Sequence, residues 1–242
     1  MKRIYLVYIL LFACSFAHPQ QAPPTNGLLG FFKLDGNAKE AEGRISPGKQ
    51  QGVKPAADRL GNHGKAVGLS YDLKTNKRSF ISIPIDINRK NSPLLTITFW
   101  IQMNNSNLAS GILYQSENEW SRTNYYRGVY VERNEGYLTW TACCGSDGAL
   151  HGPLVLAKAW AFIALVYDRD DQAMRMVVND QVYSSAANMR DGIDRLRIGP
   201  FDGQIDELRV YSRVLTLAEL ESLYGKAITK DTSDYPIAKR SD

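Results

Sequence analysis

The sequence predicts an all-β protein in which two antiparallel sheets form a sandwich, with one short helix near the C-terminus. Short apolar segments of strand-like composition recur at regular spacing, and turn signals separate them. A helical signature appears at residues 216–225, where Thr216 and Glu219 fit a capping box and Gly225 fits a C-cap. The 242 residues are enough for one such domain and its appendages.

The expected strands can be placed by composition and by the turns between them. Residues 94–103 are the most strand-like segment because they combine Thr, Ile, Phe and Trp. Residues 27–34 are apolar enough to be covered on both faces. Asn179 and Asp180 form a tight turn between two strands. Further strands are expected at residues 64–71, 80–87, 111–115, 128–132, 137–142, 160–167, 174–178, 181–183, 196–198 and 204–211.

The last long strand, residues 204–211, contains one unusual side chain. Under the two-residue period of a strand, Asp206 shares a face with Leu208 and Val210, and that face should point into a core. A carboxylate in a core needs backbone amides, a basic partner or a metal ion.

This strand and the helix after it also carry a family resemblance. The stretch GQIDELRVYSRVLTLAELESLY, residues 203–224, resembles the C-terminal signature of laminin-G-like (concanavalin A-like lectin/glucanase) jelly-roll modules. In that signature an Asp-Glu pair begins the last long strand, and a tyrosine, a basic residue and a leucine lead into a short helix. Similar segments near the start and middle extend the resemblance over residues 27–225. It implies a jelly-roll sandwich, a fold that hosts lectins, adhesion modules and glycan hydrolases alike.

The rest of the chain is divided by composition. Residues 1–17 are expected to be a secretory signal peptide, because Lys2 and Arg3 precede an apolar run that ends in Ser15-Phe16-Ala17. The alternative, a transmembrane anchor, would need a longer apolar stretch. Residues 18–26 form a proline-rich linker, residues 27–225 the jelly-roll domain, and residues 226–242 a flexible tail. The protein is therefore expected to be secreted and extracellular.

Charge excludes two classes of partner. Removal of the signal peptide lowers the formal net charge from +4 to +2, which is too little to predict binding to nucleic acid or to an anionic membrane. No stable membrane insertion is expected, and the sequence leaves the oligomeric state open.

Catalysis is not expected. Some hydrolases of this jelly-roll class carry Glu-x-Asp-x-x-Glu on one strand, with a glutamate on either side of the scissile bond. The matching stretch here begins with Gln204, which cannot ionise, and lacks the second glutamate. Cys144 and His151 are not placed by any nucleophile–base motif, and the histidines show no metal-ligand spacing. A non-catalytic module is therefore predicted.

A structural Ca²⁺ is the one cofactor that the resemblance implies. Asp35 closes the first strand and Asp206 opens the last long one, and in the resembled modules these ends lie together. Oxygen ligands of this kind suit calcium. Asn37 and Asp202 are weaker candidates. The alternative is that Asp206 accepts hydrogen bonds from loop amides or pairs with a basic neighbour.

Two adjacent cysteines remain after signal removal, because Cys14 leaves with the signal. Cys143 and Cys144 have three possible fates, which are a vicinal disulfide, intermolecular bonds or free thiols. The secretory route and the absence of other partners favour the vicinal disulfide, which would stiffen the loop after Trp140.

The predicted ligand surface combines that loop with a second one around Trp120. Aromatic rings beside amides and acids are typical of glycan recognition, since rings cover apolar C–H faces while polar groups bind hydroxyls. The candidate ligand-binding residues are Trp120, Arg122, Asn124, Tyr125, Trp140 and Asp147.

The predicted function is a secreted lectin-like module that binds carbohydrate or a glycoconjugate. A protein-binding adhesion or matrix module is the first alternative, and a glycan hydrolase of the same fold is the second. Asn104 begins the N-glycosylation sequon Asn-Asn-Ser and is expected in a loop.

Overall fold

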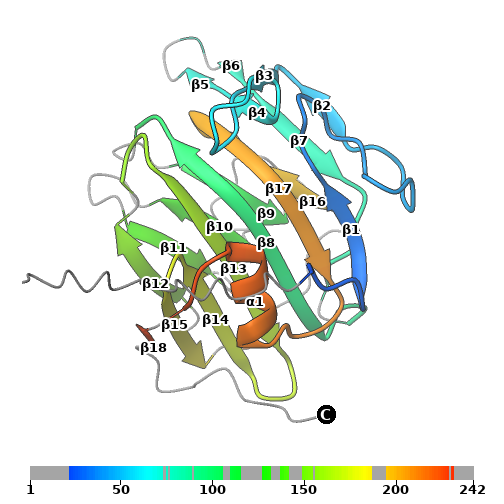
Figure 1. Ribbon diagram of the computed structural model, residues 1–242, viewed down its shortest axis with the longest axis vertical. Coiled ribbons are helices and arrows are strands. Elements are labelled where there is room, and N and C mark those ends of the chain that lie inside the picture. The colour runs from blue at the N-terminus through cyan, green and yellow to red at the C-terminus, as the bar shows by residue number, and fades with distance from the viewer. Residues whose placement is uncertain are drawn as a thin grey trace, which may run out of the picture.

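The computed structural model describes residues 22–72, 75, 77–88, 90–105, 110–115, 127–131, 137–141, 149–154, 156–186, 195–228, 230 and 231. Within these residues two large sheets face each other, and one helix lies on the outer face of one sheet (Figure 1). No helix in the described part of the chain combines the length and the apolar character needed to cross a membrane.

The larger sheet has nine strands. In spatial order these are β18 (Lys230–Asp231), β15 (Gln181–Ala186), β14 (Ala173–Val178), β13 (Trp160–Asp168), β8 (Leu94–Met103), β17 (Gly203–Tyr211), β4 (Ala66–Leu69) and β3 (Lys54–Ala56), and β1 (Leu28–Phe32) pairs with β17. All pairs are antiparallel except β15 with β18.

The second sheet has seven antiparallel strands. In spatial order these are β12 (Ala149–Leu154), β11 (Tyr137–Thr141), β10 (Arg127–Val131), β9 (Ser110–Gln115), β16 (Leu196–Ile198), β7 (Phe80–Ile83) and β2 (Lys49–Gln51). A separate ribbon pairs β5 (Tyr71–Asp72) with β6 (Lys77–Arg78), and the helix α1 covers Leu217–Tyr224.

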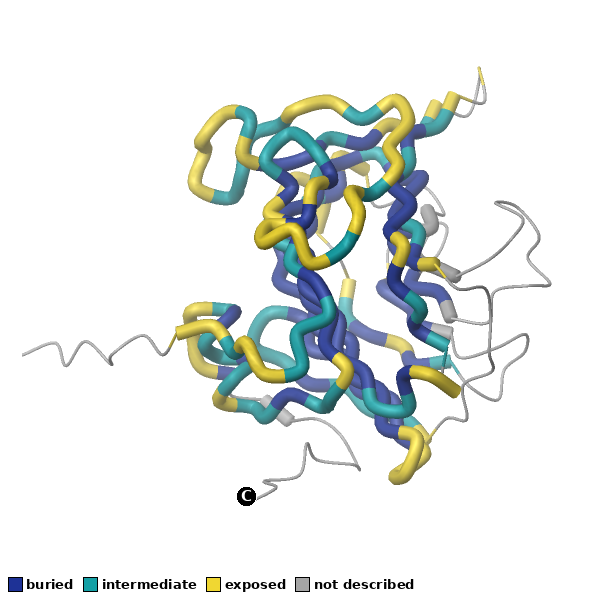
Figure 2. The backbone as a smooth tube through the Cα atoms, turned by 90° about the vertical axis from the view of Figure 1, so that its right-hand side faces the viewer, coloured by how far each residue is buried: buried dark blue, intermediate teal, exposed yellow. Residues whose placement is uncertain are grey.

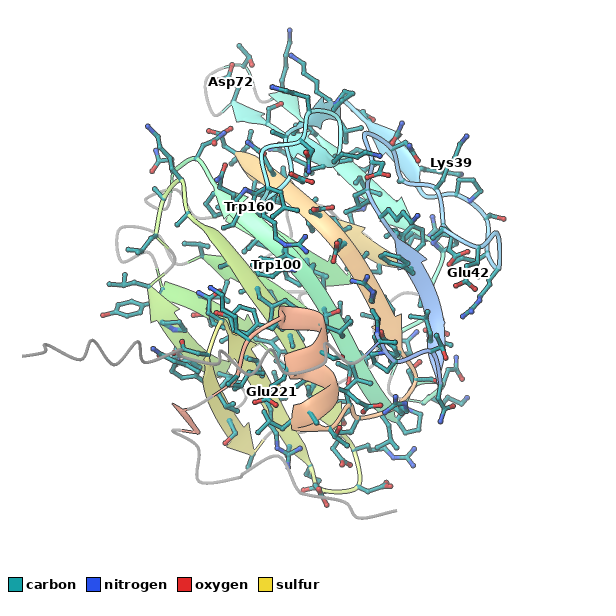
Figure 3. All side chains as sticks on the ribbon, in the orientation of Figure 1. Lys39, Glu42, Asp72, Trp100, Trp160 and Glu221 are labelled. Carbon is teal, nitrogen blue, oxygen red and sulfur yellow. The ribbon has the colours of Figure 1, made fainter. Side chains whose placement is uncertain are left out.

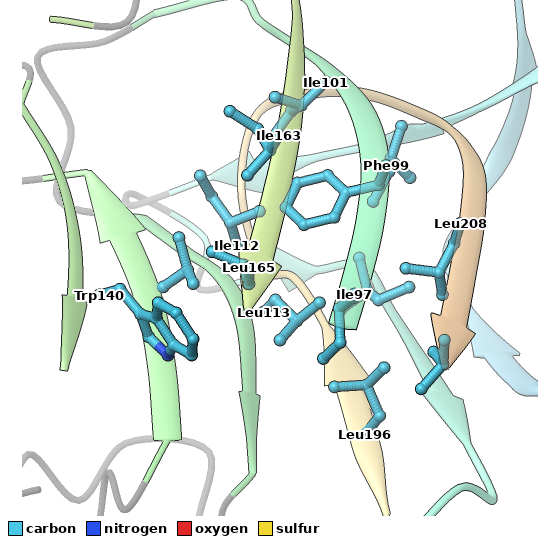
Figure 4. Packing of buried hydrophobic residues seen from close by; sticks show 14 of the residues in the cluster. Ile97, Phe99, Ile101, Ile112, Leu113, Trp140, Ile163, Leu165, Leu196 and Leu208 are labelled. Atoms are coloured by element: carbon cyan, nitrogen blue, oxygen red, sulfur yellow. The ribbon is translucent and has the colours of Figure 1, made fainter. Parts of the chain in front are cut away.

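The main core fills the space between the two sheets. The central strand β8 contributes Ile97, Phe99 and Ile101 to it, and these side chains are fully or almost fully buried (Figure 4). Burying each such side chain stabilises the fold by about 1.5–3 kcal/mol. Figure 2 shows the buried residues along the facing strands and the exposed residues mostly in the connections. The sandwich is therefore held by alternating apolar residues of both sheets.

A second apolar cluster lies on the outer face of the nine-stranded sheet. Trp100 points to this face from β8, opposite to its neighbours Phe99 and Ile101. The ring of Tyr224, at the end of α1, stacks on Phe162 with 5.4 Å between centroids. Because β8 is covered on both faces, its sequence is nearly continuously apolar.

The helix begins and ends where the sequence predicts. The Thr216 side chain accepts a hydrogen bond from the Glu219 amide, and the Glu219 carboxylate accepts one from the Thr216 amide, which is the complete capping box. Gly225 ends the helix with φ of 79°, a left-handed conformation that glycine adopts without strain.

The predicted fold class is confirmed as an all-β jelly-roll sandwich with one short helix. The differences concern short strands that composition does not reveal. Residues 149–154 form the edge strand β12 although they contain Gly152 and Pro153, and edge strands tolerate both residue types. At Gly152 an added Cβ would collide with Cε of Met176 on β14, so the missing side chain lets the two sheets approach closely here.

Candidate functional site

Most of the predicted ligand surface lies outside the described residues. The undescribed residues of the Trp120 loop are Trp120, Arg122, Asn124 and Tyr125. Those of the loop with the paired cysteines are Cys143, Cys144 and Asp147. The predicted ligand contacts and the predicted disulfide therefore stay predictions, as does the signal peptide at residues 1–17.

Trp140 is described, and its place does not agree with a ligand-facing role. The side chain belongs to the core between the sheets and is 3% exposed. It shares a face of β11 with Leu138, which is also in the core, as the two-residue period of a strand requires. A ring that is 3% exposed has no free face on which a sugar could stack, so the predicted ligand role of Trp140 is wrong.

The predicted direction of Asp206 is wrong, because β17 contains a β-bulge. Asp206 pairs with Trp100 on β8, but the next register pair joins Arg209 to Thr98, so Glu207 and Leu208 together stand opposite one residue. Glu207 takes up the extra residue with a left-handed φ of 49°. Asp206 therefore faces outward on the side of Trp100, whereas Leu208 and Val210 face the core.

Asp206 is nevertheless buried, because a loop from the N-terminal half of the chain covers it. The carboxylate is 3% exposed, and Arg59 Nη1 lies 3.6 Å from its Oδ2. Burial, and after it the negative charge of Glu207, raise the pKa of Asp206 to about 7. The guanidinium carbon of Arg59 also lies 4.7 Å from the centroid of the Trp100 ring.

Two further ion pairs surround the Asp206–Arg59 pair. We name the four residues Arg59, Asp206, Glu207 and Arg209 the Arg59 cluster. Glu207 joins both arginines, with Oε1 3.2 Å from Arg59 Nη1 and Oε2 3.2 Å from Arg209 Nη1. The loop that carries Arg59 is fixed by Asp58, whose Oδ1 accepts hydrogen bonds from the amides of Leu60 and Asn62. The cluster thus satisfies its charges internally.

The structure brings the end of β1 next to the bulge, but each predicted calcium ligand has a basic partner. The Glu207 amide donates to the carbonyl of Lys33 over 3.4 Å. Asp35 Oδ2 lies 3.2 Å from Lys65 Nζ, whereas Asp206 pairs with Arg59. Among the described residues no group of three or more His, Cys, Asp or Glu side chains could hold a metal ion. Because Ca²⁺ also accepts backbone carbonyl and amide oxygens as ligands, these ion pairs do not test the predicted site, and calcium binding stays a prediction.

The two weaker calcium candidates have local partners as well. Asn37 donates through Nδ2 to the carbonyl of Asp35 and accepts through Oδ1 from the amide of Lys39. Asp202 accepts a hydrogen bond from Nδ2 of Asn104 over 3.0 Å. Asn104 is exposed, so the surface position that glycosylation needs is present, while the modification itself stays a prediction.

A different place offers an open, mixed polar and apolar site. We name it the Trp160 hollow, a depression of about 160 Å³ where the end of β12, the start of β13 and the β14–β15 turn meet. Its apolar side includes Leu154, Leu156 and the half-buried Trp160, and its polar side includes Asn179, Asp180 and Gln181. Figure 3 shows Trp160 near Trp100, on the face of the nine-stranded sheet that carries α1.

Hydrogen bonds hold the polar side of the hollow in place. Asn179 Oδ1 accepts from the amide of Phe162 over 3.0 Å, and the Asn179 amide donates to the Phe162 carbonyl over 2.9 Å. The side-chain oxygen of Gln181 accepts from the hydroxyl of Tyr183. Burial, and after it the negative charge of Asp180, raise the pKa of the Tyr183 hydroxyl. The turn therefore presents Asp180 from a fixed backbone.

The apolar side is unusually exposed. Leu154 and Leu156 are 52% and 70% exposed, and Tyr137, which pairs in register with Leu154, is 41% exposed. The sequence does not reveal this site, because no motif joins residues 153–161 to the turn at residues 178–181, and only folding brings them together. The sequence gives one indication of the site. Trp160 is the first residue of its strand, and a polar Asn-Asp-Gln turn follows the next strand along the chain.

Comparisons with known proteins agree with this fold. Residues 77–221 match the family described as the concanavalin A-like lectin/glucanases superfamily, which is more than half of the chain. The chain belongs to this superfamily, and the predicted family is confirmed. The fold is shared by glycan hydrolases and by binding modules. No curated protein sequence matches the chain significantly.

Among solved structures, the chain is similar to domain 4 of AbnA, an extracellular arabinanase from Geobacillus stearothermophilus, in complex with arabinotriose. The TM-score is 0.59 at 17% identity, over 81% of this chain and 98% of that domain. It is also similar to a structure of botulinum neurotoxin type C, a toxin whose cell entry depends on interaction with two ganglioside molecules. The TM-score is 0.64 at 12% identity.

A third similar structure is the binding domain of botulinum neurotoxin DC in complex with SialylT, with a TM-score of 0.59 at 11% identity. Both toxin matches cover 82% of this chain, but the chain spans only 51% of each toxin chain. At these identities the likeness shows the jelly-roll fold, which the three structures share with this chain.

Proposed function

We propose that the chain is a secreted, non-catalytic module that binds carbohydrate or a glycoconjugate. The Trp160 hollow is the observation that carries the proposal. It is lined by the partly exposed Trp160 and by Asn179, Asp180 and Gln181 of one turn, and aromatic and polar residues together are typical of sugar-binding sites. The aromatic ring covers apolar C–H groups while the polar side chains bind hydroxyls, so one small surface serves both parts of a sugar.

Family and neighbours support the same class of ligand. The chain belongs to a superfamily of lectins and glucanases. A domain of nearly the same extent was solved with arabinotriose, and a similar toxin binding domain was solved with SialylT. Because these proteins are distant in sequence, they support a glycan ligand in general and not one of these particular sugars.

A non-catalytic role is part of the proposal. Cleavage of a glycosidic bond needs two carboxyl groups, one on each side of the bond. Asp180 is the one carboxylate among the described residues that line the hollow. Asp206 and Glu207 are neighbours, but Arg59 contacts both and Asp206 is buried. Reducing-sugar release from a polysaccharide panel tests the hydrolase alternative, and we expect no release above a heat-denatured control.

Secretion and an extracellular location belong to the proposal as well. They are supported by the basic and apolar pattern of residues 1–17 and by the extracellular arabinanase among the structural neighbours. N-terminal sequencing of the exported protein is expected to find a chain that begins near His18. An intact Met1 on exported protein would contradict cleavage.

The glycan proposal is tested with an array on which the mature chain is compared with its Trp160→Ala variant. We expect a consistent group of glycans to bind the parent chain, with weaker signals for the variant. If no glycan binds, while the chain captures a defined extracellular protein through Leu154 and Leu156, the adhesion alternative replaces the proposal.

A further inference from the structure

We infer that the Trp160 hollow binds a single neutral monosaccharide unit at the end of a glycan, and that it rejects acidic sugars. This inference rests on the proposed function and specifies the ligand of the same site. Three observations support it: the size of the hollow, the charge of the residues that line it, and the hydrogen bonds that fix its polar turn.

Size limits the ligand to one ring. The hollow holds about 160 Å³, whereas pockets that enclose a whole drug-sized ligand hold about 300–1,000 Å³. A single pyranose ring fits that space, and the remainder of a longer chain would extend past the exposed rim of Leu154 and Leu156.

Charge selects among single rings. Asp180 is the one ionisable side chain among the described residues that line the hollow, and it is negative. Burial, and after it the negative charge of Asp180, raise the pKa of Tyr183 and of Tyr224, so both rings lie near this carboxylate. A sialic acid or a sulfated sugar would place a second negative charge beside Asp180 at partly reduced solvent exposure, which is unfavourable. A neutral sugar instead donates its hydroxyl hydrogens to this carboxylate.

One basic residue lies close by but does not line the hollow. Lys158 stands between Leu156 and Ala159 in the β12–β13 connection and is exposed. Its backbone is bonded to the end of β8, where the Lys158 amide donates to the Met103 carbonyl over 2.6 Å and the Lys158 carbonyl accepts from Gln102 Nε2 over 3.1 Å. Lys158 therefore supplies a control, because an anionic ligand would use it and a neutral ligand would not.

The polar side is arranged before a ligand arrives. Two hydrogen bonds join Asn179 to Phe162, and Asn179 adopts a left-handed φ of 55° that Asn tolerates better than most residues. Trp160 packs partly on the second apolar cluster, so its ring has little freedom to lose on binding. A site with little disorder to lose can bind a small ligand with measurable affinity.

The experiment measures binding of methyl glycosides to the mature chain by protein NMR and by tryptophan fluorescence. The probes are the methyl glycosides of glucose, galactose, mannose, arabinose and N-acetylglucosamine, together with those of glucuronic acid and N-acetylneuraminic acid as acidic members. The variants are Trp160→Ala, Asp180→Asn and Lys158→Ala. Asp170→Asn serves as a matched control, because it changes an exposed turn at the opposite end of β14.

We expect at least one neutral glycoside to bind and both acidic ones to bind at least about tenfold more weakly, a ratio equivalent to about 1.4 kcal/mol. Trp160→Ala and Asp180→Asn should each weaken the neutral sugar by roughly tenfold. Lys158→Ala and Asp170→Asn should leave it unchanged. Because Trp160→Ala also removes packing, Asp180→Asn keeps the test valid if the first variant folds poorly.

The contradicting outcomes separate the inference from the proposed function. Preference for an acidic sugar, or neutral binding that survives Trp160→Ala and Asp180→Asn, would overturn the inference while glycan binding stands. If neither these probes nor any oligosaccharide on the array binds, the proposed function fails and the inference fails with it.

Discussion

The Arg59 cluster lies on the nine-stranded sheet, whereas the Trp160 hollow lies where that sheet meets the end of β12, and the two regions hold their acidic side chains differently. In the cluster, Glu207 contacts two arginines and Asp206 contacts one, so the charges are balanced within the protein. In the hollow, Asn179 and Gln181 use their side-chain oxygens in hydrogen bonds within the protein, whereas Asp180 lines the open depression together with Trp160.

The difference shows that an unusual residue in a sequence is not by itself a sign of function. Asp206 stands out because a carboxylate interrupts an apolar strand, yet its burial and its ion pair give it a structural role. Trp160 and Asp180 are not unusual in the sequence, because one begins a strand and the other lies in a turn. They form a candidate site only where the end of β12, the start of β13 and the β14–β15 turn meet. We therefore expect the cluster to contribute to stability and the hollow to contribute to the proposed binding.

The largest expected effect on stability comes from Arg59→Ala. This change leaves the buried Asp206 without its basic partner and removes the cation over the Trp100 ring. Breaking a buried ion pair by removing one partner costs about 3–5 kcal/mol, and we expect the lower end because Asp206 can take up a proton. Urea unfolding at pH 8 measures the loss.

The matched control is Lys65→Ala, which removes an exposed partner of Asp35. Exposed pairs contribute at most about 1 kcal/mol, so the free energy of unfolding should hardly change. Equal losses for the two variants would show that the Arg59 cluster is an ordinary surface pair.

The pH dependence of stability provides the next test. Burial raises the pKa of Asp206 to about 7 in the folded chain, above its usual value of 3.8. Between these values the folded state binds more protons at this site than the unfolded state, so stability falls as the pH rises through the window. The slope is at most about 1.4 kcal/mol per pH unit for one group.

The variant Asp206→Asn cannot ionise at this position and should remove that part of the slope. At pH 8 it should be at least as stable as the parent chain, because the parent keeps a costly buried charge there. Urea titrations at half-unit pH intervals from 4 to 8 compare the two, and an unchanged slope in the variant would assign the pH dependence to other groups.

A smaller effect is expected at the helix, where stability and binding can be separated. Thr216→Ala removes the side-chain half of the capping box and should cost about 1 kcal/mol. The helix does not line the hollow, so the affinity for a glycan should not change. A loss of binding in this variant, at a temperature where it is folded, would show that the two regions are coupled.

The smallest effect is expected from chelation. If Asp35 and Asp206 are satisfied by Lys65 and Arg59 alone, EDTA leaves the Tm unchanged. An ion that binds only the folded chain would stabilise it, and its removal would lower the Tm. A reproducible decrease that Asp206→Asn abolishes would establish the predicted calcium site instead.

The sequence was sufficient for the fold because its signals are local. Strand periodicity placed the long strands, and the Thr216–Glu219 capping box with Gly225 placed the helix. The bulge was not predictable in this way. Glu207 adopts a left-handed φ that usually indicates glycine or asparagine, and one extra residue reverses the side to which Asp206 points.

The candidate site was harder to predict for two reasons. The two-residue period of β11 places Trp140 on the same face as Leu138, so the burial of Trp140 could have been predicted. Its position close to the paired cysteines suggested a ligand role instead. The Trp160 hollow depends on contacts between β12, β13 and the β14–β15 turn, and no local pattern contains that information.

One measurement tests the division of roles most directly. Calorimetry with a glycan selected on the array compares the parent chain with Trp160→Ala and Arg59→Ala, and thermal melting is recorded for all three. We predict that Trp160→Ala weakens binding by about 1–3 kcal/mol while losing less stability than Arg59→Ala. Arg59→Ala should melt earlier and, where folded, bind like the parent chain. Parent-like affinity in Trp160→Ala together with lost affinity in folded Arg59→Ala would place the binding site at the Arg59 cluster and contradict the account.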